Sequence, residues 1–373
     1  MTYSTPLFSP ISLGTVELEN RLMVSPMCQY SAVNGNPVDW HYVHLGSLAV
    51  SGVGLLCLEA TAVSAVGRIT PGCLGLYGDE NQDKLGKLLN HLRSISSTPI
   101  AIQLGHAGRK ASSHTPWEGG SLISTEEGGW SPIAPSGVSQ KPTEPAPTSM
   151  GTEDIHRVVQ EFSQAALRAK SLGFDAIELH MAHGYLMHQF MSPLSNTRCD
   201  EYGGSFENRI RLALQVFKAV LEAAGPRIPV GVRLSATDWV DHGWGVEQTV
   251  KLSQRLEAMG CAFLDISSGG LSHLQKIPIG PGYQVPFAEA VKRVVKIPVI
   301  AVGLITTGAQ AQEILTEGKA DMIAIGRGFL HDPRWPWRAA AELGGTVHVP
   351  KQLLRSLPRG HAAIFGDVQI GQR

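Results

Sequence analysis

The feature that most constrains the fold is one pattern repeated along the chain: a short apolar run rich in β-branched residues, followed by a stretch with helical periodicity. Eight such runs occur, at residues 22–25, 55–59, 100–104, 176–180, 230–234, 263–267, 299–302 and 322–325. Most of them are apolar without alternation, as parallel strands covered on both faces are. The pattern predicts an α/β protein, a single (β/α)8 TIM barrel, with an open doubly wound sheet as the alternative.

The segments outside the repeat predict how the chain is divided. We expect one barrel over residues 1–345 and a C-terminal extension, without clear periodicity, over residues 346–373. Residues 106–151 are rich in Pro, Gly and Ser and follow the third strand, at the end of a barrel where active sites form. A segment of this length predicts a lid; a surface insertion without a role is the alternative.

Two helices show particular signals. The apolar residues within residues 155–169 recur at the spacing of one helical face. Asp79 is the expected N-terminal cap of the helix after the second strand, with Gln82 three residues further on.

Composition excludes several classes of protein. The 373 residues are 43% hydrophobic and carry a net charge of −1, so neither a nucleic acid nor an anionic membrane is an expected partner. The five cysteines are odd in number and form no C-x-x-C pair, which argues against a disulfide framework or a metal site. The longest apolar run, residues 48–58, is too short to span a bilayer, and no signal peptide is visible. We expect a cytoplasmic protein.

Glycines and an arginine follow the last two predicted strands. Gly303 follows the seventh strand, and Gly326 and Arg327 follow the eighth. Barrel enzymes often bind phosphate with backbone N–H groups at this place, and the guanidinium fork suits a phosphate. The sequence therefore predicts a phosphate site; two tight turns are the alternative. The Gly-Val-Gly at residues 52–54 is not a dinucleotide fingerprint, because a strand follows it rather than a helix.

The end of the fourth strand carries the densest group of reactive side chains. His180, His183 and Tyr185 together can hydrogen-bond a substrate oxygen and supply a proton. No carboxylate or cysteine joins them at the spacing of metal ligands, and no H-E-x-x-H occurs. Cys28 follows the first strand, where a buried inert thiol is more common than a nucleophile. Arg233, on an apolar strand, predicts an anionic partner, either a ligand or a salt bridge.

Several longer motifs resemble those of the old yellow enzyme family, from residue 7 to about residue 345. They are S-P-M-C-Q-Y at 25–30, E-A-T-A-V at 59–63, H-A-G-R-K at 106–110, H-M-A-H-G-Y-L at 180–186, D-E-Y-G-G-S-F-E-N-R at 200–209 and I-G-R at 325–327. Cys28, where other branches commonly carry threonine, makes the chain most similar to the thermophilic-like branch, which includes bacterial xenobiotic reductases.

This resemblance implies a barrel that binds one FMN non-covalently, with NADPH or NADH as the electron donor. It implies two groups of cofactor-binding residues: Ser25, Pro26, Met27, Cys28, Ala60, Gln103 and Arg233 around the ring, and Gly303, Gly326 and Arg327 at the phosphate. Arg233 then stabilises the negative charge of the reduced ring, and Cys28 tunes its reactivity.

The resemblance also implies the activity of an ene-reductase, or NADPH dehydrogenase. Hydride passes from N5 of FMN to Cβ of an enone, a maleimide or a nitro compound, while His180 and His183 bind the substrate oxygen and Tyr185 donates a proton. Tyr30 is expected to line the substrate pocket. Such enzymes form homodimers or homotetramers, in which an arginine from the tail reaches the neighbouring site. Arg359 is the candidate, and a solvated surface arginine is the alternative.

Two other functions remain open from the sequence. One is a flavin-free, phosphate-binding barrel lyase or isomerase, which needs a lysine or carboxylate base at a strand end; Glu59 is the plain candidate. The other is a flavin-binding redox sensor without turnover.

Overall fold

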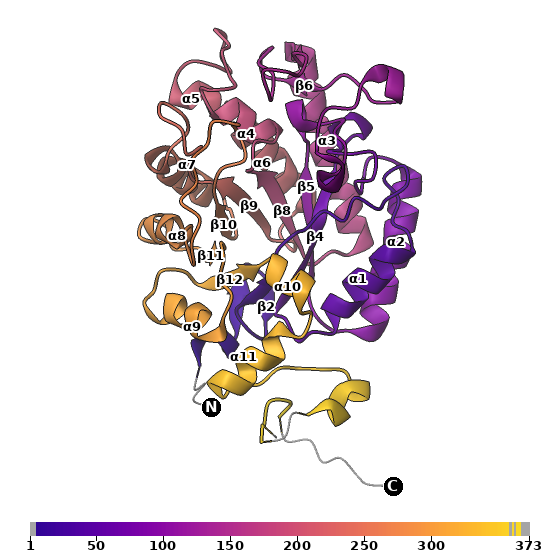
Figure 1. The fold of residues 1–373 in the computed structure, drawn as a ribbon, viewed down its shortest axis with the longest axis vertical. Coiled ribbons are helices and arrows are strands. Elements are labelled where there is room, and N and C mark those ends of the chain that lie inside the picture. The colour runs from indigo at the N-terminus through magenta and orange to yellow at the C-terminus, as the bar shows by residue number, and fades with distance from the viewer. Residues whose placement is uncertain (1–4, 358–359, 362, 367–373) are drawn as a thin grey trace.

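The computed structural model describes residues 5–357, 360–361 and 363–366. Eight parallel strands close into a barrel, in the order β10-β11-β12-β3-β4-β5-β8-β9 (Figure 1). The strands are β3 (Leu22–Val24), β4 (Leu55–Ala62), β5 (Ile100–Gly105), β8 (Ala176–Met181), β9 (Val230–Ser235), β10 (Leu264–Ser267), β11 (Val299–Ala301) and β12 (Met322–Ile325). The predicted strands and the closed barrel are confirmed, and the open sheet is excluded.

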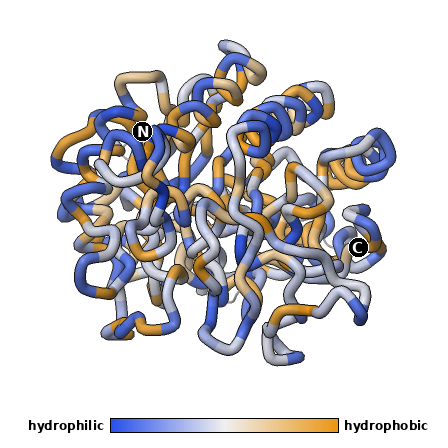
Figure 2. Tube along the Cα trace, turned by 90° about the horizontal axis from the view of Figure 1, so that it is seen from above, coloured by the Kyte–Doolittle hydropathy of each residue, from blue (hydrophilic) through white to orange (hydrophobic). Residues whose placement is uncertain are grey.

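A helix follows each barrel strand and packs on the outside. These outer helices are α1 (Asp39–Ala49), α2 (Asp79–Ile95), α3 (Thr152–Leu172), α6 (Arg211–Ala224), α7 (Val246–Ala258), α8 (Val285–Lys292), α9 (Gly308–Thr316) and α11 (Trp335–Leu343). Short helices α4 (Leu186–Met191), α5 (Phe206–Arg209) and α10 (Arg327–His331) are inserted after β8 and β12. Hydrophobic and hydrophilic residues alternate along the helices, as the view from above shows (Figure 2). The main core therefore lies between the barrel and this ring.

A hairpin fills the end of the barrel at which the strands begin. It consists of β1 (Ile11–Leu13) and β2 (Val16–Leu18), which pair antiparallel. Leu13 and Leu18 are buried in one cluster with side chains from inside the barrel, among them Met23, Leu55 and Phe263. This end of the barrel is filled with side chains, so an active site can form only at the opposite end, where the strands finish.

The expected cap of α2 is wrong by one residue. Gly78, in an extended conformation, is the N-cap, and Asp79 is the first helical residue. The Asp79 carboxylate instead forms an ion pair with Arg168 of α3, at 2.7 Å. An acidic residue in the first turn still interacts favourably with the helix dipole.

The segment over residues 106–151 forms short elements only. These are the 3-10 helices η3 (Gly108–Lys110), η4 (Pro116–Glu118) and η5 (Thr125–Glu127), and the paired strands β6 (Ile133–Ala134) and β7 (Thr148–Ser149). After α11 the tail forms one more 3-10 helix, η6 (Lys351–Ser356), and Arg359 lies outside the described residues. Within the described part of the chain, every helix is too short or too polar to cross a membrane.

Candidate active site

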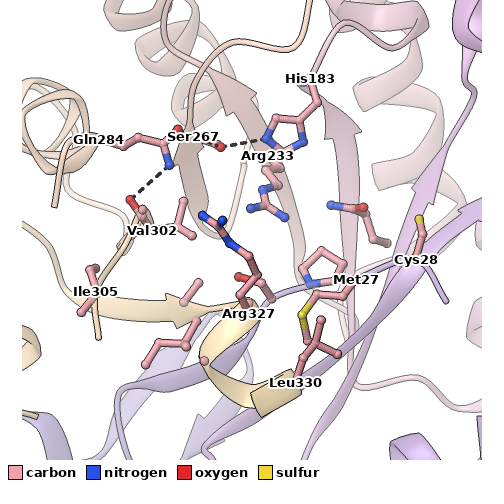
Figure 3. Close-up of a pocket in the computed structure, with 18 of the residues that line it drawn as sticks. Met27, Cys28, His183, Arg233, Ser267, Gln284, Val302, Ile305, Arg327 and Leu330 are labelled. Carbon is pink, nitrogen blue, oxygen red and sulfur yellow. Dashed lines mark hydrogen bonds between the residues drawn. The ribbon is translucent and has the colours of Figure 1, made fainter. Parts of the chain in front are cut away.

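A cavity of about 390 Å³ opens at the carboxyl ends of the barrel strands. It is lined by all the predicted site residues that the structure describes, namely Ser25, Pro26, Met27, Cys28, Tyr30, Ala60, Gln103, His180, His183, Tyr185, Arg233, Gly303, Gly326 and Arg327. Arg233 and Arg327 point into the same space (Figure 3). Among the described lining residues these arginines are the only charged side chains, so the cavity suits an anion.

The loop after β8 brings three rings together. The His180 ring lies edge-on to His183, with 5.1 Å between ring centroids, and edge-on to Tyr185, at 4.8 Å. The chain turns sharply here, because His183 and Gly184 both have positive φ, at 57° and 73°. The Tyr185 N–H donates to Ala182 O at 3.1 Å and closes the turn. The predicted cluster is therefore a real cluster in space.

His183 is already hydrogen-bonded on one side. Its Nε2 lies 2.7 Å from Ser267 Oγ, at the end of β10, and Ser267 Oγ lies 3.3 Å from Gln284 Oε1 (Figure 3). When the Ser267 hydroxyl donates to Nε2, the neutral ring carries its proton on Nδ1. Both imidazoles were expected to bind a substrate oxygen, but only Nδ1 of His183 remains for that purpose. Ser267 and Gln284 line the cavity and were not predicted. The strand-end position of Ser267 was the only signal in the sequence.

Burial fixes the protonation of the three rings. Burial, and then the charge of Arg233, lower the pKa of His180 and of His183 well below the usual value. Both imidazoles are neutral at neutral pH. Burial also raises the pKa of the Tyr185 phenol well above its usual value. The site therefore holds a protonated phenol beside neutral imidazoles.

Two basic residues of η3 hold the loops of the site. The Lys110 ammonium donates to His183 O and to Gly270 O, each at 2.9 Å, and so ties the loop after β8 to the loop after β10. Arg109 donates to Leu271 O at 2.8 Å. The sequence singled out this motif without assigning it a role, because its partners are backbone carbonyls far along the chain.

Acidic residues lie inside the barrel, below the cavity. Asp265, fully buried on β10, forms an ion pair with Arg233 at 3.0 Å. This is the salt bridge that the sequence left as one of two possibilities. Gln103 donates to Glu178 at 2.7 Å, and burial raises the pKa of Glu178 to about 8. Arg233 is thus held between Asp265 and the cavity.

Glu59 is not a base for this site. It lies where the register of β4 on β5 shifts, between Leu58 and Ala60. Its carboxylate accepts from the Gln29 N–H at 3.0 Å and lies 3.4 Å from His41. A bulge of this kind redirects a side chain, and Glu59 does not line the cavity.

Buried His106 makes stability depend on pH. Burial, and then Arg157, lower its pKa from 6.5 to about 3. Between these values the unfolded chain binds a proton that the folded chain does not, so stability is lost as the pH falls through 6.5. We expect His106 alone to cost about 2 kcal/mol at pH 5 relative to pH 7.5. Urea unfolding at the two pH values measures this difference.

A His106→Asn variant is the matched control for this prediction. Asn can accept the Gly108 N–H, as His106 Nδ1 does at 3.0 Å, but has no proton to bind in acid. The difference between the two pH values should shrink by about 2 kcal/mol. An unchanged difference would show that His106 is not the group responsible.

The fold and the cavity define the class: a TIM-barrel enzyme with its active site at the carboxyl ends of the strands. A model of the NADH:flavin oxidoreductase / NADH oxidase family matches residues 6–344. The chain belongs to this family, the family of the old yellow enzymes. It is therefore an oxidoreductase that uses FMN, with NAD(P)H as the electron donor.

Individual relatives agree with this assignment. The chain is 44% identical to an NADH:flavin oxidoreductase of Gibberella zeae, over 94% of this chain and 89% of that protein. It is 43% identical to an NADPH dehydrogenase of a Geobacillus species, over 94% and 98%. Morphinone reductase has a similar structure, with a TM-score of 0.76 and 27% identity over 94% and 93% of the chains. The chain spans 52% of 2-naphthoyl-CoA reductase, which shares the fold at a TM-score of 0.81.

The residues present fit FMN. Ser25 Oγ is buried at the cavity without a hydrogen-bond partner. Among the described residues, the Arg327 guanidinium has neither an ion pair nor a hydrogen bond. Gly303 has a φ of 119°, a backbone conformation that residues with a side chain rarely adopt. Unused polar groups and close backbone approach are what a phosphate-bearing cofactor requires.

Proposed function

We propose that this protein is an ene-reductase, which reduces the carbon–carbon double bond of enones, maleimides or nitroalkenes. The observation that carries the proposal is the protonated Tyr185 phenol beside His180, in a cavity whose charged lining is two arginines. FMN, when bound, supplies hydride transfer from NAD(P)H to the substrate Cβ.

The side chains then have separate tasks. Ser25 to Cys28, Ala60, Gln103 and Arg233 hold the ring, and Gly303, Gly326 and Arg327 hold the phosphate. His180 and His183 bind the substrate oxygen and stabilise the charge that develops on it; His183 does so through Nδ1–H, with the Ser267 hydroxyl donating to its Nε2. Tyr185 protonates Cα, while Lys110 keeps the loop after β8 in place. Tyr30 forms part of the substrate wall.

The lyase or isomerase is less well supported. It needs a base at the cavity, but no described lining residue is a lysine or a carboxylate. The redox sensor without turnover differs from an ene-reductase only in activity, so it is decided by experiment.

Three further parts of the proposal concern the periphery. Residues 106–151 act as a lid: exposed Trp117 lies edge-on to Tyr30, with 5.7 Å between centroids, although this segment does not line the cavity. Arg359 reaches the active site of a neighbouring copy in a homodimer or homotetramer. The protein acts on small molecules in the cytoplasm.

Anaerobic turnover tests the proposed function. The purified protein should absorb near ~450 nm, as oxidised flavin does, and should oxidise more than one equivalent of NADPH only when cyclohexenone is present, yielding cyclohexanone. Flavin bleaching by NADPH without product would favour the redox sensor. A protein that binds no FMN would exclude both.

Removing Arg327 should weaken binding of the phosphate specifically. In an Arg327→Gln variant we expect the FMN dissociation constant to rise by roughly 10- to 100-fold, because a hydrogen bond to a charged group contributes about 1.5–3 kcal/mol. Riboflavin, which lacks the phosphate, should bind the variant and the unchanged protein equally. Fluorescence titration of the FMN-free protein measures both constants.

Arg338→Gln is the matched control for that prediction. Arg338 is an exposed arginine in α11 that pairs with Asp332 at 2.6 Å and does not line the cavity. The Arg338→Gln substitution removes the same charge as Arg327→Gln. If the net charge of the protein alone mattered, FMN would bind more weakly to both variants. Equal losses for FMN and riboflavin in Arg327→Gln would refute a phosphate contact.

A further inference from the structure

Two buried carboxyl groups inside the barrel contact residues that line the cavity. Asp265 of β10 is paired in register with Arg233 of β9, and Glu178 of β8 is paired with Gln103 of β5. Arg233 and Gln103 line the cavity, whereas both acidic residues are fully buried and do not line it. We call these four residues the inner polar cluster.

The two contacts of the inner polar cluster differ in charge. The Arg233 guanidinium lies 3.0 Å from the Asp265 carboxylate, so Asp265 faces a full positive charge. Glu178 accepts a hydrogen bond from the Gln103 amide at 2.7 Å, and an amide supplies no counter-charge. Asp265 is therefore the acidic residue whose ionised form the structure stabilises.

The number of charges in the inner polar cluster indicates where a proton lies. An arginine side chain is always protonated, so two ionised carboxylates would leave one uncompensated negative charge inside the barrel. Burying such a charge is costly, and a carboxyl group in this position takes up a proton instead. Because the guanidinium lies beside Asp265, the proton is on Glu178. The cluster then holds one positive charge, one negative charge and a neutral acid.

The pKa values of the two acids agree with this assignment. Burial, and then the charge of Asp265, raise the pKa of Glu178 to about 8, so Glu178 is mainly protonated at neutral pH. Burial also raises the pKa of Asp265, but the charge of Arg233 opposes that shift.

The charge of Asp265 reduces the positive potential that Arg233 creates in the cavity. Neither carboxylate oxygen of Asp265 has a hydrogen-bond partner among the described residues, so no other donor compensates its charge. The negative potential of Asp265 adds to the positive potential of Arg233 throughout the neighbouring space, where the effective dielectric constant is about 20. An anion in the cavity therefore meets a guanidinium that is already partly neutralised.

We propose that Asp265 lowers the reduction potential of bound FMN by offsetting the charge of Arg233. Asp265 is a positioning residue, because it acts through Arg233 and does not line the cavity. This inference rests on the proposed function, in which Arg233 lies beside the ring of FMN. A hydride from NAD(P)H brings two electrons and one proton, so the ring gains one negative charge while the nicotinamide is oxidised. Asp265 therefore disfavours the reduced ring more than the neutral, oxidised ring, and makes the reduced ring a stronger hydride donor.

The equilibrium reduction potential of the FMN-loaded protein tests this proposal. An Asp265→Asn variant keeps the shape of the side chain and removes its charge, so we expect the potential to rise. Reduced FMN should bind about tenfold more tightly relative to oxidised FMN, which corresponds to about 30 mV for a two-electron couple. Spectrophotometric titration against a reference dye measures the potential in the absence of NAD(P)H and of any enone.

Glu178→Gln is the matched control for this measurement. This substitution is also close in shape, but it removes a carboxyl group that is already neutral, so the potential should stay at that of the unchanged protein. Asp265→Glu restores the charge and should return the potential toward its original value. If Asp265→Asn does not fold, Asp265→Ser carries the same expected rise.

Three results would overturn the proposal: an unchanged potential in the neutral Asp265 variants, a fall in their potential, or an equal rise in Glu178→Gln. These results are distinguishable from a failure of the proposed function. A protein that holds a reducible FMN but reduces no enone would refute the ene-reductase, and its potentials could still be compared. An active ene-reductase whose potential does not respond to the charge of Asp265 would refute the role of Asp265 alone.

Discussion

Replacing Tyr185 by Phe lowers the rate of enone reduction by about 10²- to 10⁴-fold, the contribution typical of a positioned general acid. The ring remains to pack against His180, at 4.8 Å between centroids, so only the hydroxyl is lost. Reduction of FMN by NADPH needs no proton from this phenol and continues at nearly its original rate. Stopped-flow absorbance measures the two half-reactions separately.

Tyr283→Phe is the matched control for this prediction. Tyr283 is another half-buried phenol of the same cavity, on the side of Gly303 and Arg327. Both half-reactions should survive its loss of a hydroxyl. If Tyr185→Phe slows both half-reactions equally, the phenol positions the cofactor and is not the proton donor.

Replacing Arg233 by Leu lowers the free energy of unfolding by about 3–5 kcal/mol, the usual cost of leaving one partner of a buried ion pair alone. Asp265 is fully buried 3.0 Å from Arg233, and neither of its carboxylate oxygens has a hydrogen-bond partner in the described structure, so Leu leaves it without a counter-charge. Urea unfolding of the FMN-free protein measures this effect. FMN must be absent because a bound cofactor adds its own stabilisation by mass action.

The double variant Arg233→Leu, Asp265→Leu distinguishes the cost of an unpaired buried charge from the loss of the ion pair itself. Two apolar residues leave no buried charge, so most of the lost stability should return. Arg233→Lys keeps the charge and should fall between the single variant and the unchanged protein. A single variant that unfolds at the original urea concentration would show that Asp265 does not carry a charge in the fold.

Most of the fold was predictable because buried parallel strands leave a clear trace in the sequence. Most of the barrel strands are largely apolar runs, and the residues at their carboxyl ends are the ones that line the cavity. This is why the sequence alone predicts that His180, Arg233 and Arg327 lie at one site. The cap of α2 was wrong because the sequence does not show that Arg168 takes the carboxylate of Asp79.

The rest of the site depends on contacts between distant segments. Lys110 donates to the carbonyl oxygen of His183, 73 positions away in the chain. Every residue has a backbone carbonyl, so the sequence cannot indicate which one Lys110 contacts. The bulge at Glu59 depends on how β4 pairs with β5. Residue identities alone give none of these relations.

The hairpin of β1 and β2 closes one end of the barrel, so stability and catalysis depend on residues at opposite ends of the molecule. Leu13 and Leu18 pack into the end of the barrel at which the strands begin. Truncating them should lower the free energy of unfolding without changing a residue that lines the cavity. At the carboxyl ends of the strands, Lys110 and similar side chains connect the loops to one another. Substitutions there should affect activity before they affect stability. Adaptation to heat and adaptation to a new reactant therefore draw on separate sets of positions in this chain.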